Sequence, residues 1–187
     1  MARELKATEV MVPCRISYAH IWKPYTNKDG SAGKYGTALL IPKDDKKTIA
    51  KIENAVKAAI DAGKSKLANK EGKVVLKGLK LPLRDADEEE ISDAAYKGMM
   101  FFNASSDRKP QVVDRRKERI EDEDEVYSGC FCNVLINFYA FSVDGNKGIA
   151  AGLGNIQKVK DGERLAGGHT ADEDFDELDD EDEDSIF

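Results

Sequence analysis

The 187-residue sequence has no long apolar run, only two histidines and only three cysteines. No segment approaches the roughly 20 consecutive apolar residues that a membrane-spanning helix requires, so we expect no membrane partner. The first six residues, Met1 to Lys6, are too polar for a secretory signal. An odd number of cysteines in such a chain fits reduced thiols better than disulfides. The sequence therefore predicts a soluble protein of the cytoplasm.

Motifs of the common enzyme classes are also absent. No Gly-x-x-x-x-Gly-Lys-Ser/Thr phosphate-binding loop occurs, and the Gly-Leu-Gly at 152–154 is too short to indicate a nucleotide fold. The two histidines, His20 and His169, are far apart in sequence, and neither lies in a nucleophile motif. The acidic run at 85–90 lacks partner carboxylates on neighbouring strands, so we interpret it as a solvated surface and not as a two-metal site. The sequence argues against an enzyme, and no cofactor is expected.

One group of residues has the ligand types of a zinc site. Cys130 and Cys132 face the same way on a strand, and Cys14 and His20 would complete the set. Structural zinc sites, however, usually separate the two ligands of a pair by two or more residues. Both cysteines also lie on a face of small residues, where free cysteine is commonly a small hydrophobe. We predict buried thiols and no metal, with zinc as the minor alternative.

Charge is distributed unevenly along the chain. The sequence carries 36 acids and 29 bases, and residues 172–187 hold eleven of the acids and no Lys or Arg. The remainder therefore has 25 acids against the same 29 bases, a net charge of +4. A block of like charge repels itself and buries too little apolar area to fold. We predict a folded domain at 1–165 and a disordered acidic tail at 166–187 that ends in Ser-Ile-Phe.

The folded part is predicted to be mainly β-strands with one or two helices. Period-two alternation and apolar runs predict strands at 10–22, 35–41, 98–106, 109–114, 126–142 and 149–159, with a weaker one at 74–76. Apolar residues at helical spacing predict a helix that is capped by Asp44 or Asp45 and ends at Gly63. Gly129 is expected to mark a bulge or sharp bend in the longest strand.

The order and number of these elements suit an OB-fold-like five-stranded Greek-key barrel with insertions. A β-sandwich is the main competitor, since it would give much the same pattern. On the first strand, Tyr18, His20 and Trp22 share the face of Val10 and Val12. On the longest strand, the small, even-numbered side chains suit a barrel interior.

Aromatic residues are interleaved with basic residues in three parts of the sequence. These are the run from Trp22 to Tyr35, the segment 101–109, and the stretch 115–139. A groove for single-stranded nucleic acid needs this pairing, because cations follow the phosphates and flat rings stack on bases without reading sequence. For any single ring, core packing is the simpler interpretation, and we assign Tyr18, Phe102 and Phe138 to core faces. That interpretation is weaker for Trp22, Tyr25 and Tyr35, which border the basic loop, and for the odd-numbered aromatic residues of the longest strand.

Several blocks of the sequence match one family in the same order. They are Ile16-Ser17-Tyr18-Ala19-His20-Ile21-Trp22-Lys23-Pro24, Tyr35-Gly36-Thr37-Ala38-Leu39-Leu40-Ile41-Pro42-Lys43, Leu83-Arg84-Asp85, Val126-Tyr127-Ser128-Gly129-Cys130 and Gly145-Asn146-Lys147-Gly148. On these blocks the chain resembles a phage and prophage family long catalogued as a domain of unknown function. It is similar to phage single-stranded DNA-binding proteins with an OB fold. Its acidic end also resembles the tails of such proteins, which implies a tail that recruits replication and recombination partners and competes with DNA for the groove.

Our leading hypothesis is a non-catalytic, sequence-tolerant single-stranded DNA-binding protein for phage replication and recombination in the bacterial host cytoplasm. The expected DNA contacts are Trp22, Lys23, Tyr25, Lys34, Tyr35, Arg108, Lys109, Arg115, Arg116, Tyr127 and Phe131. The expected partner-binding residues of the tail are Asp179, Asp180, Glu181, Asp182, Glu183, Asp184, Ile186 and Phe187. The alternatives are an acidic-tail adaptor or DNA mimic whose barrel ignores nucleic acid and, less favoured, a metal-dependent enzyme. The sequence leaves open whether the protein is a homodimer.

Overall fold

The structure, a computed structural model, describes residues 1–165. Its elements in chain order are β1 (Glu9–His20), β2 (Tyr35–Pro42), α1 (Lys46–Ala62), α2 (Lys64–Leu67), η1 (Leu76–Gly78), β3 (Arg84–Asp85), η2 (Ala94–Tyr96), β4 (Met99–Ser106), β5 (Val112–Val113), β6 (Phe131–Val143) and β7 (Asn146–Lys160). The predicted disordered tail, with its partner-binding residues, lies outside the described residues. None of the helices in residues 1–165 is long and apolar enough to cross a membrane.

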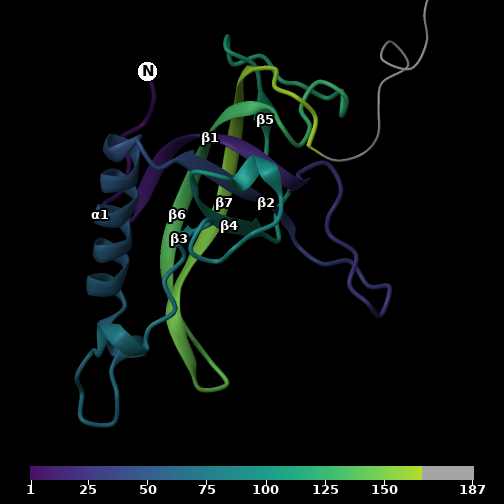
Figure 1. Cartoon of the computed structure of the whole chain (residues 1–187). Helices are drawn as coiled ribbons and strands as arrows, with labels where there is room; N and C mark the ends of the chain where they lie inside the picture. The colour runs from purple at the N-terminus through teal and green to yellow at the C-terminus, as the bar shows by residue number, and fades with distance from the viewer. Residues whose placement is uncertain (166–187) are drawn as a thin grey trace, which may run out of the picture.

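Five of the strands close into a barrel (Figure 1). Antiparallel pairings join β1 to β2 and β6, β2 to β4, and β6 to β7. A short parallel pairing, Ala104 with Ala151 and Ser105 with Gly152, joins β4 to β7 and completes the ring. The order β1-β2-β4-β7-β6 is that of an OB-fold Greek-key barrel, with β3 and β5 as added strands. The predicted barrel is confirmed, and its closure into one sheet excludes a β-sandwich.

Alternate side chains of the long strands fill the barrel. On β6 the even-numbered residues from Cys132 to Ala140 are buried, as expected for the interior. Phe102 and Phe138, both predicted for the core, are 1% exposed, and their ring centroids lie 5.6 Å apart. Burial of such side chains is the main stabilising contribution, at roughly 25 cal/mol per Å² of apolar surface.

Helix α1 lies along one side of the barrel, next to β1 and β6 (Figure 1). It begins after Asp45, whose carboxylate accepts a hydrogen bond from the Thr48 N–H at 3.2 Å, and it ends at Gly63. Both ends agree with the prediction. The helix packs because its apolar positions recur at helical spacing, which places Ile52 and Ala59 against the core.

Strand β1 contains one extra residue near its end. Ser17 pairs with Ala38 whereas His20 pairs with Gly36, so three steps along β1 match two along β2. Such an insertion is a β-bulge. Tyr18, which lies within it, has a φ of +46°.

The bulge overturns the prediction that Tyr18 and His20 face the core. Up to Ile16 the even-numbered side chains of β1 point inward, but beyond the bulge Ile21 is buried and both Tyr18 and His20 are exposed. An inserted residue exchanges the two faces of a strand. Period-two alternation therefore assigned the second half of β1 to the wrong side, although Trp22 does pack partly against the core.

Three other predicted elements differ from the structure. The strand predicted from 126 begins only at Phe131, because Gly129 takes a φ of +118° and interrupts the extended backbone. Gly129 thus marks the expected bend. The strand predicted at 74–76 is wrong, since the only regular element there is the 3-10 turn η1. The strand predicted at 109–114 is confined to the two residues of β5.

The described chain ends on the outer surface of the barrel. The Arg15 side chain donates to the Gly129 carbonyl at 3.1 Å and to the Glu163 carbonyl at 2.7 Å. The Leu165 N–H donates to the Ser128 carbonyl at 3.0 Å. A Cβ at Gly129 would collide with the Glu163 carbonyl. Glycine is therefore needed where residues 161–165 lie against the start of β6.

The Cys/His group predicted as a minor zinc alternative does not assemble. Cys14 and Cys132 are direct cross-strand partners inside the barrel, and Cys130 is also buried as a free thiol. His20 is on the outer face because of the bulge. Within residues 1–165, no group of three or more His, Cys, Asp or Glu side chains is placed to hold a metal ion.

Gly129→Ala should lower the free energy of unfolding by about 2–4 kcal/mol, because a methyl group there combines backbone strain with a collision. Urea unfolding followed by circular dichroism measures the change. Gly78→Ala is the control, since no heavy atom lies within 4 Å of the added methyl and its φ is not in the left-handed region. Equal stability of the two variants would contradict the close approach at Gly129.

In the native protein, the three thiols should resist Ellman's reagent at pH 8. Burial raises the pKa of Cys132 to about 12 and raises that of Cys14 well above its ordinary value. The reactive thiolate is therefore scarce at this pH, and it should form only as the pH rises toward the elevated pKa. In denaturant all three should react at once. Rapid labelling of the native chain would show that the barrel interior is accessible.

Candidate nucleic-acid interface

A cleft of about 430 Å³ lies on the outer face of the barrel, where β1, β2 and β4 meet. β2 and β4 are the second and third strands of the barrel, and OB folds bind oligonucleotides on this face with the adjoining loops. We call it the tyrosine cleft. It is lined by Tyr18, His20, Tyr25, Lys34, Tyr35, Gly36, Thr37, Ala38, Asn103, Ala104 and Ser105.

Two tyrosines of the cleft are open to solvent. Tyr18 is 59% exposed and Tyr25 is 52% exposed, unlike the buried aromatic rings of the core. The Tyr25 ring meets His20 edge-on, with ring centroids 5.4 Å apart. The Tyr18 ring leans on Tyr96, with centroids 6.4 Å apart, and burial raises the pKa of Tyr96. Exposed rings that are supported from one side are suited to stack on bases.

The backbone at Tyr18 is strained, because a φ of +46° is unusual for a bulky side chain. Hydrogen bonds of the two neighbouring residues hold the Tyr18 backbone in this conformation. The Thr37 hydroxyl donates to the Ser17 carbonyl at 3.0 Å, and the Ala19 N–H donates to the Ser128 hydroxyl at 2.9 Å. Such strain costs about 1–3 kcal/mol and is found mainly where it serves a function. Here its effect is to turn an aromatic ring outward into the cleft.

The loop between β1 and β2 is a small hairpin. The Tyr25 N–H donates to the Lys34 carbonyl at 3.0 Å, and the Gly33 N–H donates to the Tyr25 carbonyl at 2.6 Å. An isolated bridge joins Thr26 to Ala32. These bonds hold Tyr25 next to Lys34 at the rim of the cleft, which pairs an aromatic ring with a cation.

Cations in the cleft and in the segments that continue from it have no carboxylate partners. Lys34 lines the cleft, Lys23 is exposed just before the hairpin loop, and Arg108 and Lys109 lie in the turn after β4, beyond Asp107. None of the ion pairs within residues 1–165 engages these four side chains. Unpaired cations can neutralise phosphates, and the release of counterions favours binding of nucleic acid.

Trp22 and Lys109 line a second hollow, of about 340 Å³. The Trp22 Nε1–H donates to the Val126 carbonyl at 2.8 Å, and the ring packs partly against the core. The Lys109 Nζ lies 5.8 Å from the ring centroid. Trp22 is thus anchored on one side and faces a cation on the other.

Tyr127 and Phe131 lie outside both hollows. The Tyr127 hydroxyl donates to a backbone carbonyl of the C-terminal segment at 2.9 Å, and the Arg164 guanidinium lies 4.0 Å from its ring centroid. Phe131 contacts two cations, with Arg15 at 5.5 Å and Lys160 at 4.8 Å from its ring centroid. On a ring face that one of these cations occupies, a base could stack only by displacing the cation.

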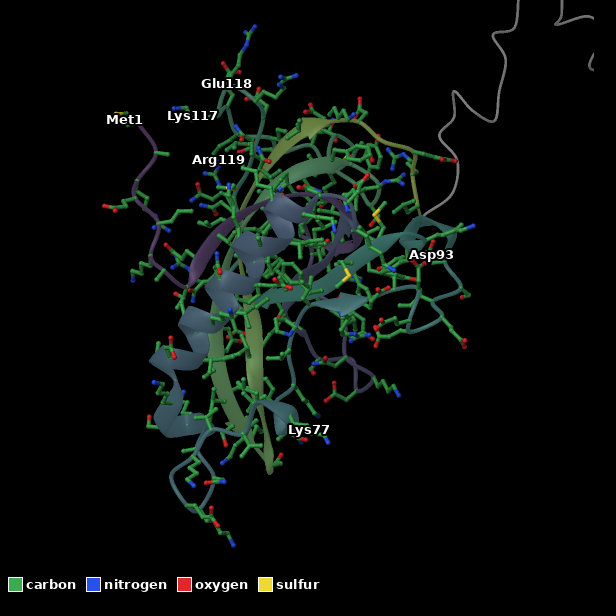
Figure 2. All side chains as sticks on the ribbon, turned by 60° about the vertical axis from the view of Figure 1, so that its left-hand side comes forward. Met1, Lys77, Asp93, Lys117, Glu118 and Arg119 are labelled. Carbon is green, nitrogen blue, oxygen red and sulfur yellow. The ribbon has the colours of Figure 1, made fainter. Side chains whose placement is uncertain are left out.

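Arg115 and Arg116 are exposed in the turn after β5, next to Lys117, Glu118 and Arg119, which Figure 2 labels at the upper edge of the molecule. They do not line the tyrosine cleft. Of the predicted contacts, the structure therefore brings Tyr25, Lys34 and Tyr35 into one cleft.

Four residues that line the cleft are not among the predicted contacts: Tyr18, His20, Asn103 and Ser105. For the first two, the available signal was length, since a strand predicted over 10–22 exceeds the usual 3–10 residues and commonly contains a bulge. For the last two, period two along 98–106 already places them opposite Phe102, on the outer face. What the sequence did not show is that this outer face borders the hairpin loop.

The acidic run at 85–90 is a surface of ion pairs. Lys43 Nζ lies 2.6 Å from Asp85 and 2.6 Å from Asp87, and Arg84 pairs with Glu89 at 2.9 Å. The hydrogen bond from Lys43 is the main cause that lowers the pKa of both aspartates. This agrees with the interpretation as a charged surface segment.

The closed barrel with a cleft on its β2–β4 face defines the class of OB-fold ligand-binding proteins. A family model described as Enterobacter phage Enc34, ssDNA-binding protein, matches residues 8–186, and the chain belongs to this family. The resemblance stated from the sequence blocks is therefore confirmed.

Individual relatives agree with the family. "Putative protein p50" of Acyrthosiphon pisum secondary endosymbiont phage 1 is 30% identical over 171 residues, which cover 88% of this chain and 90% of that protein. The single-stranded DNA-binding protein from bacteriophage Enc34, solved in complex with ssDNA, is 28% identical with a TM-score of 0.68, covering 88% of this chain and 97% of that one. A C-terminal truncation of the Enc34 protein gives 25% identity and a TM-score of 0.69, covering 87% and 95%.

Proposed function

We propose that the protein binds single-stranded DNA in the tyrosine cleft, without catalysis and with little regard to sequence. The observation that carries the proposal is the outward Tyr18, held by a strained bulge beside Tyr25 on the β2–β4 face. Rings stack on any base, which gives affinity without a sequence code. The Enc34 relative, solved with ssDNA bound, supports this choice of ligand.

The DNA path is proposed to run from the hairpin loop across β2 and β4. Tyr18, Tyr25 and Tyr35 would contact bases, while Lys23, Lys34, Arg108 and Lys109 would contact phosphates. Trp22 would report binding, because it lies next to Lys109. Arg115, Arg116, Tyr127 and Phe131 belong to the path only if the DNA extends beyond the cleft.

The acidic tail is proposed to compete with DNA for this cleft and, once displaced, to recruit replication or recombination proteins in the host cytoplasm. Two observations support the competition. Leu165, where the described chain ends, packs against the cluster that contains Tyr96, and Tyr96 contacts Tyr18. The following 22 residues therefore start beside the cleft, and they carry the eleven carboxylates counted above.

Tyr18→Ala and Tyr25→Ala should each weaken binding to oligo-dT by about 5- to 150-fold, since one stacked base contributes roughly 1–3 kcal/mol. Trp22 fluorescence titration at low salt measures the affinity. Tyr139→Ala is the matched control, because this tyrosine is also strand-borne and 42% exposed but lies away from the cleft. An equal loss in all three variants would place the DNA elsewhere.

Truncation after Gly168 should tighten oligo-dT binding, because it removes a polyanion that competes for the same cations. The advantage of the truncated chain should shrink as salt rises, since screening weakens both ligands. For the truncated chain, log affinity should fall with log salt by about 0.7 per neutralised phosphate. Equal affinity of both forms would exclude competition and leave DNA binding intact. No binding by either form at low salt would favour the adaptor alternative.

A further inference from the structure

A second surface combines lysines with exposed aliphatic side chains. Val75, Leu76 and Leu81 are 53%, 60% and 46% exposed, although large apolar side chains usually avoid water. Lys73, Lys77 and Lys80 alternate with them, all exposed, and the sequence from 73 to 83 contains no acid. None of the ion pairs within residues 1–165 engages these three lysines. We call these six residues the basic–apolar patch.

The patch is built on a fixed backbone. The Lys80 N–H donates to the Lys147 carbonyl and the Lys80 carbonyl accepts from the Ile149 N–H, both at 2.9 Å. The Lys147 ammonium donates to the Ala68 carbonyl at 2.6 Å, and Leu79 packs against the core. The exposed aliphatic side chains are therefore presented by an anchored segment, as in a binding surface.

The C-terminal end of this chain has the complementary chemistry. Six consecutive carboxylates, 179–184, precede Ser185, Ile186 and Phe187. Carboxylates pair with the lysines, and an apolar end covers the aliphatic side chains. The patch has no aromatic ring, whereas a surface that stacks bases needs one. An acidic, apolar peptide therefore fits it better than single-stranded DNA.

The patch lies away from the point where the described chain ends. In Figure 1 the yellow end of the chain is at the upper right and residues 64–81 run along the lower left; Figure 2, turned by 60°, has Lys77 low on the molecule. From these positions we infer that the basic–apolar patch binds residues 179–187 of a second copy. Contact between different sides of successive copies is heterologous, so it builds either a closed ring or an open row of copies. Such a row would suit copies side by side on one DNA strand, although the contact itself does not require DNA.

A labelled peptide of residues 176–187 tests the patch without any DNA. The receptor is the chain truncated after Gly168, because the barrel is complete by Lys160 and the Enc34 relative was solved as a C-terminal truncation. Fluorescence anisotropy at low salt should show binding. The double substitution Leu76→Ser with Lys77→Glu should weaken it at least tenfold, and so should removal of Ile186 and Phe187 from the peptide.

Two controls separate the patch from other cationic surfaces. Met11→Ser with Lys51→Glu makes the same chemical changes in another shallow hollow and should leave peptide binding within twofold. Tyr25→Ala with Lys34→Glu removes the tyrosine cleft as a second site for the acidic peptide, and in this background the patch contact, and its loss on Leu76→Ser with Lys77→Glu, should remain. Unchanged peptide binding by the patch variant would overturn the inference. Loss of short oligo-dT binding by the patch variant would overturn it too, by assigning the surface to nucleic acid.

Self-association of the full-length chain shows whether the tail comes from a second copy. Sedimentation velocity of the full-length chain should show mass rising with concentration, whereas the patch variant and the truncated chain should each stay monomeric. A mixture of the two should form a one-to-one heterodimer, because one supplies the tail and the other the patch. A full-length chain that stays monomeric at every concentration, although the mixture forms the heterodimer, would show that each patch takes the tail of its own chain, which contradicts the inference. A monomeric mixture would show that tail and patch do not bind each other, and it would overturn the inference too. None of these outcomes depends on whether the cleft binds DNA.

Discussion

The barrel and its cleft both depend on how β1 pairs. This strand bonds to β2 on one side and to β6 on the other, so its inward side chains join the two halves of the core. At Tyr18 the extra residue lets the pairing with β2 continue while the two faces exchange. Without the bulge, Tyr18 would compete for the interior that Ile21 fills. With it, one strand supplies aliphatic side chains to the core and an aromatic ring to the cleft.

Basic and acidic residues are concentrated in different parts of the chain. The described body carries the excess of bases, and those around the tyrosine cleft and on the basic–apolar patch have no carboxylate within ion-pair distance inside residues 1–165. Acids of the body are used differently: Asp85 and Asp87 hold Lys43, and Glu9 pairs with Arg3 at 2.8 Å. The surplus of negative charge lies in the tail. The proposed competition of this tail with DNA depends on these unpaired cations, because they are the groups that both polyanions would bind.

Local rules predicted much of the fold. Asp45 caps α1 because a carboxylate at that position satisfies a free N–H, and Phe138 is buried because β6 alternates without interruption. The same rules failed at Tyr18 and at 126–130, where one backbone residue leaves the extended conformation. A bulge or a left-handed glycine is decided by pairing partners that lie far away in sequence: Ala38 and Gly36 for the former, Glu163 for the latter. A local sequence pattern carries no information about those distant partners.

The sequence by itself determined the division into a basic body and an acidic end, the strand-rich barrel, the helix from 46 to 62, and the family. These follow from composition, periodicity and ordered motifs, which are local properties of a chain. Only the tertiary structure decided which aromatic rings meet in one cleft. It brought Tyr18, Tyr25 and Tyr35 together, set Trp22 partly into the core, and covered Tyr127 and Phe131 with cations. The reason is that the exposure of a ring depends on strand register and on what packs over it, and both are set by contacts between distant segments.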